Sequence, residues 1–198
     1  MIKFINHNNE APFKKFKGLY DLALKNNQSL IEAVLIASYD IENKEVDARY
    51  VNLKFIDNNK FIFFSNYESP KSKHFSSHNQ ISAVFHWQSI NTQIRIKAKI
   101  SKSSEDFSNQ YFENRDIEKN ALAISSKQSK SIESYERVKE NYYSSLKNKN
   151  LTIRPDYWGG FKFIPYYFEF WEGNDRRINK REAYKLSRHK WSSYYLQP

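Results

Sequence analysis

The sequence predicts a mainly β chain with a helical elaboration, an α+β fold in which antiparallel strands close into a barrel flanked by helices. Segments rich in β-branched and aromatic residues recur along most of the 198 residues, as strands do. Short polar connections such as Asp57-Asn58-Asn59 favour hairpins over crossover units. Helical spacing replaces the strand pattern between Ser103 and Asn150. We therefore expect one domain over residues 1–198, with a helical insertion at about 103–150 and a C-terminal strand segment at 158–198.

The first predicted element is an amphipathic helix from Pro12 to Asn26. Proline suits the first turn of a helix, and Asn26-Asn27 provide a stop signal. Apolar side chains recur at helical spacing on one face: Phe13, Phe16, Tyr20 and Leu24.

Strands are predicted next, because β-branched and aromatic residues dominate the following segments. They are Ala33 to Tyr39, Ala48 to Ile56, Lys60 to Asn66, Ile81 to Trp87 and Gln93 to Ser101. The insertion then carries apolar residues at helical spacing, namely Phe107, Tyr111, Ala121, Ile124, Ile132, Tyr135, Val138 and Tyr142. Strands return at Gly160 to Pro165, Tyr167 to Trp171, Glu182 to Ser187 and Trp191 to Leu196.

The composition indicates a core built from aromatic rings. Aromatic residues make up 17% of a chain that is only 39% hydrophobic, so rings must supply much of the buried area. The absence of cysteine excludes disulfides, thiolate metal sites and cysteine nucleophiles, and suits a reducing compartment. The N-terminal residues lack a signal peptide's apolar segment, and no apolar run approaches the roughly 18 residues of a membrane span. We expect a cytoplasmic protein without a membrane partner.

The formal net charge of +10 predicts attraction to anions without identifying them. Nucleic acid, an acidic membrane surface and a phosphorylated small molecule all remain compatible with it. The basic residues are scattered and accompany no known nucleic-acid motif, so no nucleic-acid partner is expected. The frequent Asn, Lys, Ile and Tyr offer a purely compositional explanation for part of the lysine excess.

Several common kinds of site have no support in the sequence. With only four glycines, the chain contains neither a dinucleotide fingerprint nor a glycine-rich phosphate loop, so side chains must hold any bound phosphate. His74 and His78 lie four positions apart, as metal ligands can, but no third ligand completes a site and no metal is expected. A nucleophile elbow and a carboxylate pair for acid-base catalysis are also missing.

The segment from Phe168 to Arg181 concentrates rings and guanidinium groups on a strand-turn-strand. Arg177 and Arg181 follow Trp171, and planar guanidinium groups suit phosphates, carboxylates and heterocycle carbonyls. A solvated basic hairpin is the alternative explanation. Other candidate anion-binding side chains are dispersed along the chain: Arg49, Lys54, Lys71, Tyr111, Arg115, Gln128 and Ser129.

These residues stand in motifs that resemble the pyridoxamine 5′-phosphate oxidase family. Arg49-Tyr50-Val51-Asn52-Leu53-Lys54, Phe64-Ser65-Asn66 and Ser69-Pro70-Lys71 look like the flavin-binding portion of that family. Trp158-Gly159-Gly160-Phe161, Glu169-Phe170-Trp171, Arg177, Arg181 and the closing Trp191 to Pro198 are similar to its C-terminal signature. The similarity runs from about Ala33 to Pro198, which makes it more specific than any single motif.

The resemblance implies an FMN-binding split β-barrel and a homodimer with two flavin sites at the subunit interface. The FMN contacts that it implies are Arg49, Val51, Lys54, Phe64, Ser65, Lys71, Gln93, Gln128, Ser129, Trp171 and Arg181. Among these, Arg49 and Lys71 can neutralise a phosphate. Trp171 serves equally well as a core anchor.

The resemblance also implies the substrate contacts and the reaction. Lys54, Tyr111, Arg115 and Lys119 would hold the substrate phosphate, while Arg177 and Asn179 would flank its ring as the catalytic pair. The implied reaction oxidises pyridoxamine or pyridoxine 5′-phosphate to pyridoxal 5′-phosphate, with dioxygen reduced to hydrogen peroxide. The flavin performs the redox chemistry, which explains the missing acid-base pair.

The chain departs from the family pattern at three positions. Asn179 stands where the family has a histidine, Pro70 replaces an arginine beside Lys71, and Lys119 replaces a serine. The N-terminal segment that covers the substrate in longer relatives is also expected to be largely missing. Two alternatives therefore stay open: a split-barrel FMN oxidase with another substrate, of the phenazine-biosynthesis type, and a flavin- or polyanion-binding protein without turnover. The phosphate-binding trio Lys54, Tyr111 and Arg115 argues against the first.

Overall fold

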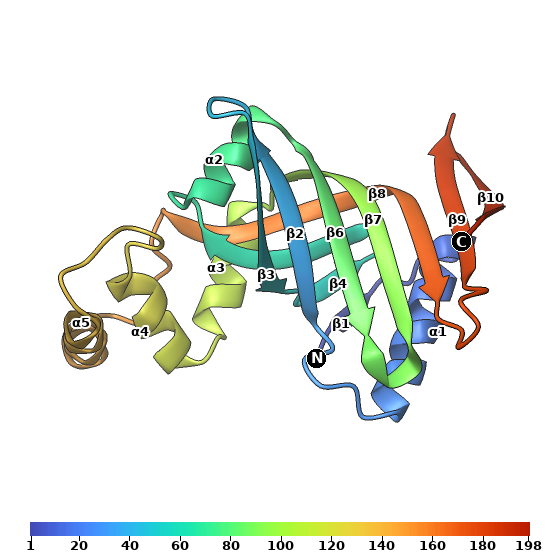
Figure 1. Cartoon of the computed structure of the whole chain (residues 1–198). Helices are drawn as coiled ribbons and strands as arrows, with labels where there is room; N and C mark the ends of the chain where they lie inside the picture. The colour runs from blue at the N-terminus through green and yellow to red at the C-terminus, as the bar shows by residue number, and fades with distance from the viewer.

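The structure is a computed structural model that describes residues 1–198, except for the side chain of Asn148. The described residues form one ten-stranded, mainly antiparallel sheet with helices around it, as Figure 1 shows. The strands are β1 (Lys3–Ile5), β2 (Ala33–Asp40), β3 (Glu45–Asn52), β4 (Phe55–Asp57), β5 (Lys60–Asn66), β6 (Gln80–Trp87), β7 (Thr92–Lys102), β8 (Trp158–Glu172), β9 (Lys180–Ser187) and β10 (Lys190–Leu196). The predicted mainly β fold class with a helical elaboration is confirmed.

The helices lie at three places around the sheet (Figure 1). They are α1 (Ala11–Lys25), α2 (Pro70–Ser77), the short 3₁₀ helix η1 (Gln88–Ile90), α3 (Glu105–Glu113), α4 (Ile117–Ser125) and α5 (Tyr135–Asn148). The predicted helical segment thus consists of α3, α4 and α5, which lie at the opposite end of the molecule from the β9–β10 hairpin. In the described part of the chain, no helix is both long enough and apolar enough to span a membrane.

Strand β8 organises the sheet. The strand order is β1-β4-β5-β8-β7-β6-β2-β3, and only the β1–β4 pair is parallel. Strand β7 pairs with β8 along its whole length. On the other edge of β8, strand β5 pairs with the first half of β8 and strand β9 pairs with the second half. The sequence predicted two strands here, but a bulge between Pro165 and Tyr167 bends one continuous strand. Pro165 has no N–H to donate, which interrupts the ladder without ending the strand.

The predicted strand from Ala48 to Ile56 is divided at Leu53 and Lys54. The Leu53 amide donates to the Glu32 carbonyl (2.9 Å), but the Lys54 amide donates to the Ile62 carbonyl (2.8 Å). At this corner the chain therefore leaves the neighbourhood of β2 and joins β5. The prediction was wrong here because the change of neighbour depends on contacts between segments that are distant in sequence.

The core consists largely of aromatic rings, as predicted. Helix α1 inserts Phe16, whose ring centroid lies 5.2 Å from those of Phe61 and Phe85. The rings of Phe61, Phe63, Phe161, Phe163, Phe168 and Phe170 are fully buried between the strands. Leu24, predicted on the buried face of the helix, is instead 42% exposed, because the buried stripe of α1 continues to Ala23.

Candidate functional site

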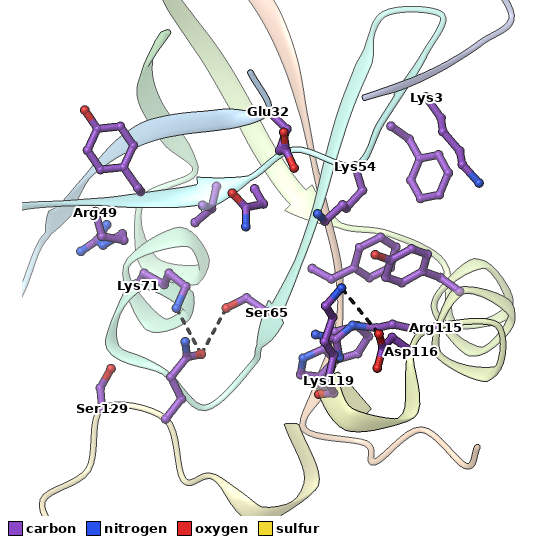
Figure 2. A pocket seen from close by; sticks show the side chains of 18 of the residues that line it. Lys3, Glu32, Arg49, Lys54, Ser65, Lys71, Arg115, Asp116, Lys119 and Ser129 are labelled. Carbon is purple, nitrogen blue, oxygen red and sulfur yellow. Dashed lines mark hydrogen bonds and ion pairs between the residues drawn. The ribbon is translucent and has the colours of Figure 1, made fainter. Parts of the chain in front are cut away.

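A cavity of about 880 Å³ opens beside the corner between β3 and β4. Side chains from β3, β5, α2 and the helical insertion line it (Figure 2). It gathers most of the predicted binding residues: Arg49, Val51, Lys54, Phe64, Ser65, Lys71, Tyr111, Arg115, Lys119, Gln128 and Ser129. These residues lie up to 80 positions apart in the sequence, from Arg49 to Ser129, so the fold brings them together.

At one end of the cavity, Lys71 is surrounded by uncharged acceptors. Its ammonium group donates to Ser69 Oγ (3.1 Å) and to Gln128 Oε1 (3.3 Å), and Ser65 Oγ donates to the same Gln128 oxygen (3.2 Å; Figure 2). Only 7% of Lys71 is exposed. Burial, reinforced by the positive charge of Arg49, lowers the pKa of Lys71 to about 8. This end of the cavity is prepared for an anion that would compensate the buried charge.

Arg49 is held on the same side of the cavity by contacts across the β2–β3 pair. Its Nη1 donates to Ser38 Oγ (2.7 Å) and to the Ile36 carbonyl (3.4 Å). Its Nη2 forms an ion pair with Asp47. The guanidinium group is therefore oriented before any ligand binds, which reduces the entropy lost on binding.

The other end of the cavity carries a second group of cations, Lys54, Arg115 and Lys119 (Figure 2). Burial lowers the pKa of Lys54, and the nearby Lys119 and Arg115 lower it further, while Glu32 opposes them. Arg115 donates to the Lys119 carbonyl (3.1 Å), and its guanidinium carbon lies 4.9 Å from the centre of the Trp158 ring. Lys119 is exposed and lies 3.9 Å from Asp116.

Aromatic side chains form the wall beside this second group. Tyr111 stacks on Phe64 with ring centroids 3.7 Å apart, and Phe64 also stacks on Trp158 at 5.4 Å. Burial raises the pKa of Tyr111, so its hydroxyl keeps its proton and remains a donor. The cavity thus combines two cationic ends with flat aromatic surface.

The remaining predicted binding residues lie outside this cavity. Gln93, Trp171 and Arg181 stand side by side in one row across β7, β8 and β9. Arg181 donates from Nε (3.0 Å) and Nη2 (2.8 Å) to Oε1 of Glu169, which is only 3% exposed. The second oxygen of Glu169 accepts from Arg95 (3.1 Å). Glu169 therefore fixes the guanidinium plane of Arg181 and neutralises part of its charge.

Arg177 and Asn179 lie in the turn between β8 and β9, also outside the cavity. Asn179 Oδ1 accepts from the Asn174 amide (3.0 Å), so this side chain closes the turn. Arg177 is exposed and adopts a left-handed backbone conformation, with φ of 61°. The turn thus presents the Arg177 side chain to the outside of the chain.

Sequence reasoning missed the residues that support the cavity. Ser38 and Asp47 hold Arg49, Trp158 stacks on Arg115, and Glu32 lies beside Lys54. Trp158 belongs to the Trp158-Gly159-Gly160-Phe161 motif, but sequence reasoning assigned it no role. Nothing in the sequence pointed to Ser38, Asp47 or Glu32, because their contacts arise from the way the strands pair. Among the described residues, no cluster of three or more His, Cys, Asp or Glu side chains could hold a metal ion.

The fold and the cavity define a class of protein, the split β-barrels whose cavity is lined by cationic and aromatic side chains from separate elements. Family models narrow this class. Residues 26–141 match the pyridoxamine 5′-phosphate oxidase family, and residues 158–198 match the pyridoxine 5′-phosphate oxidase C-terminal dimerisation region. The chain belongs to the pyridoxamine 5′-phosphate oxidase family.

Individual relatives agree with this assignment. The chain is 31% identical to a pyridoxine/pyridoxamine 5′-phosphate oxidase of Colwellia psychrerythraea over 192 residues, which cover 96% of this chain and 88% of that protein. It is 35% identical to the oxidase of the same name from Gloeothece citriformis over 194 residues, covering 96% and 90%.

Solved structures share the fold. PhzG from Burkholderia lata, in complex with tetrahydrophenazine-1-carboxylic acid, superposes with a TM-score of 0.89 at 21% identity, covering 94% of this chain and 92% of that one. A pyridoxamine 5′-phosphate oxidase-related, FMN-binding protein from Nostoc punctiforme gives 0.76 at 15% identity, covering 96% and 99%. At these identities the likeness shows the split-barrel fold alone.

Proposed function

We propose that this protein is an FMN-dependent oxidase that converts pyridoxamine 5′-phosphate and pyridoxine 5′-phosphate to pyridoxal 5′-phosphate, reducing dioxygen to hydrogen peroxide. One observation carries the proposal: a single cavity has a cationic group at each end and aromatic surface beside it. This arrangement suits two phosphorylated ring systems, with a phosphate at each cationic group and the rings along the aromatic surface. The family and the names of its relatives support the same reaction.

The first end of the cavity fits the phosphate of FMN. Lys71 is a buried ammonium group that has no carboxylate in ion-pair range among the described residues, and Arg49 is oriented beside it. A phosphate dianion would compensate the charge of Lys71 and would accept hydrogen bonds from Arg49, which is already paired with Asp47. Further hydrogen bonds would come from Ser65, Gln128 and Ser129. The flavin would be contacted by Val51 and Phe64, and Lys54 would stand between the two ligands.

The second end fits the phosphate of the substrate. Lys54, Arg115 and Lys119 supply positive charge there, and Tyr111 supplies a hydroxyl donor. Stacking on Trp158 limits the motion of Arg115. The exposed Lys119 adds charge where the family pattern has a serine, so the substrate phosphate would meet a more positive site.

The predicted residues outside the cavity would complete the site from a second subunit. The matched dimerisation region, 158–198, contains Trp171, Arg177, Asn179 and Arg181, and Gln93 lies beside Trp171. In a homodimer these side chains would face the partner's cavity. Arg177 would lie over the substrate ring, Asn179 would hold the turn that carries Arg177, and Arg181 would approach the flavin with its plane set by Glu169.

When bound, FMN would accept the hydride from C4′ of the substrate and pass the electrons to dioxygen. The chain's own residues would bind and orient the two ligands. The two cationic groups would hold the two phosphates, and Arg177 would restrict the motion of the substrate ring. The amine substrate would become an imine, which water would hydrolyse to pyridoxal 5′-phosphate and ammonia.

The proposal is tested by the ultraviolet-visible spectrum of the purified protein and of two variants. We expect flavin absorbance in the wild type, and its bleaching on anaerobic addition of pyridoxamine 5′-phosphate. Arg49→Ala should lose FMN, whereas Arg177→Ala should retain FMN but lose at least about 10-fold in turnover, because it removes a contact to the substrate alone.

Each contrary result has a distinct meaning. A yellow protein that pyridoxamine 5′-phosphate does not bleach would point to the flavin binder without turnover, or to the phenazine type of substrate. A colourless protein that does not bind added FMN would refute the proposal. Equal loss of FMN in the two variants would contradict the roles given to the two arginines.

A further inference from the structure

A chain of hydrogen bonds leads from Arg49 into the protein, away from the cavity. Arg49 Nη1 donates to Ser38 Oγ (2.7 Å), and Ser38 Oγ lies 3.1 Å from His74 Nδ1. On the far side of the ring, His74 Nε2 lies 3.4 Å from Asp40 Oδ2. Ser38 is 3% exposed and His74 is 8% exposed, so water cannot easily replace these contacts.

One arrangement of donors and acceptors joins all the groups in this chain of hydrogen bonds. Because the Ser38 oxygen accepts from Arg49, its own proton is free to be donated to His74 Nδ1. In this arrangement the other ring nitrogen, Nε2, is the one that faces the Asp40 carboxylate. Asp40 in turn accepts from the Asn43 side chain (2.8 Å), which lowers its pKa and keeps it ionised.

Three different elements contribute to this arrangement, so it depends on the tertiary structure. Ser38 and Asp40 lie near the end of β2, Arg49 lies on β3, and His74 lies on α2. Helix α2 also carries Lys71, three positions before His74. One helix thus places the ammonium group at the cavity and also supports the neighbouring guanidinium group from behind.

We propose that Ser38, His74 and Asp40 form a positioning relay that orients Arg49 toward the phosphate of FMN. The inference rests on the proposed function, because it assigns the anion at Arg49 to that cofactor. None of the three residues lines the cavity. Their connection to it runs through Arg49, which does line it. They would therefore act on the phosphate alone and not on the flavin ring.

This restriction gives a test that separates positioning from general folding. The dissociation constants of FMN and of riboflavin, which lacks the phosphate, are measured by quenching of flavin fluorescence. His74→Phe keeps the ring but removes both nitrogen atoms. We expect FMN affinity to fall roughly 10-fold, the usual scale for a hydrogen bond to a charged group, with riboflavin affinity unchanged.

Further variants check that the three residues act as one unit. Ser38→Ala should weaken FMN binding as much as His74→Phe, and the double variant should lose little more. His74→Asn retains an acceptor near the position of Nδ1 and should restore most of the affinity. The matched control is His78→Phe at the C-cap of the same helix, whose ring contacts Tyr39 instead, with no change in FMN affinity expected.

Two results would overturn the relay while leaving the proposed function intact: unchanged FMN affinity in His74→Phe, or an equal loss for FMN and riboflavin. A wild-type protein that binds neither flavin would overturn the proposed function, and the relay with it.

Discussion

Lys71 carries a buried positive charge that lowers the stability of the folded chain. It is buried, and its contacts in the described structure are with Ser69 and Gln128 instead of a carboxylate. Removing a positive charge from water without an ion-pair partner destabilises the folded state. The lowering of its pKa from 10.5 to about 8 corresponds to roughly 3 kcal/mol. Such a residue is typical of a site whose missing partner is a ligand.

The pH dependence of stability follows from the direction of this shift. Below about pH 8 both the folded and the unfolded ligand-free chain carry the Lys71 proton, so the full penalty is present. Between about pH 8 and pH 10.5 the folded chain loses that proton first, and the penalty disappears. We predict that Lys71→Met raises the unfolding free energy of the FMN-free protein by about 1–3 kcal/mol at pH 7, and by much less at pH 10.

Urea unfolding at both pH values measures this effect. Lys73→Met on the same helix is the control, because Lys73 is exposed and its replacement should change stability little at either pH. The Lys71 variant should also bind FMN at least about 10-fold more weakly, since it lacks a phosphate contact. A less stable Lys71→Met protein at pH 7 would contradict the argument.

At the scale of elements, the close packing around the start of β8 explains why Gly159 and Gly160 are both glycines. A Cβ atom at Gly159 would overlap the Tyr67 hydroxyl, and one at Gly160 would lie 2.9 Å from Ser103 Cβ. Tyr67 donates to the Gly160 carbonyl (3.2 Å), and Ser108 Oγ accepts from the Gly160 amide (3.1 Å). The glycines therefore let β8 approach α3 and the turn before α2 closely, next to the aromatic wall of the cavity.

We predict opposite effects of alanine at two glycines. Gly159→Ala should lower the unfolding free energy by about 1–3 kcal/mol, because Tyr67 must move. Gly18→Ala should raise it by about 0.5–1 kcal/mol, because Gly18 lies within α1 with no atom within 4 Å of a Cβ. The free energies of unfolding of both variants are measured by thermal and urea unfolding. An equal change in the two variants would refute this account of the β8 packing.

At the scale of the whole molecule, the candidate site is divided into two groups of residues. Arg49 and Lys71 line the cavity, whereas Arg177 and Arg181 lie at the β9–β10 end of the molecule, opposite the end that carries α3, α4 and α5 (Figure 1). One chain cannot bring the two groups together without rearranging the sheet. A homodimer could do so by placing the hairpin of each subunit at the cavity of the other.

We predict that two inactive variants restore activity when they are combined. In a mixed dimer of Arg49→Ala and Arg177→Ala, one site receives both altered residues and the other receives neither. Random pairing should therefore restore about a quarter of the wild-type activity. The two chains are co-expressed with different tags, and oxidase activity is measured on the doubly tagged dimer and on the mixture.

The control pair is Arg49→Ala with Lys71→Met. Both residues line the same cavity, so every site in that mixture keeps a defect and activity should stay low. Mixed dimers of the first pair that form but stay inactive would contradict the shared site.

Much of the fold could be predicted from local patterns. The predicted strand Lys60 to Asn66 coincides with β5, and the helical segment after Ser103 is present, because residue type and spacing decide such elements locally. Strand β1 was missed because its three residues carry no pattern and are held by pairing with β4. The division at Leu53 and Lys54 was missed because it follows from hydrogen bonds to Glu32 and Ile62, which are distant in sequence.

The candidate site divides in the same way. Residue types in order along the chain were enough to nominate Arg49, Lys71, Tyr111 and Arg115, which do meet in one cavity. The support of Arg49 by Ser38 could not be seen, because it depends on the diagonal register of β2 and β3. The hydrogen bond that Asn179 accepts within its own turn was equally invisible in the sequence.

The sequence by itself determined the fold class and the aromatic core, since these follow from composition and from the periodicity of apolar and aromatic residues. Only the tertiary structure decided which cations share a cavity, which of them are buried without a counter-charge, and which lie too far away to join them in one chain. The reason is physical: burial and pairing depend on contacts between distant segments, and those contacts set both the pKa of Lys71 and the orientation of Arg49.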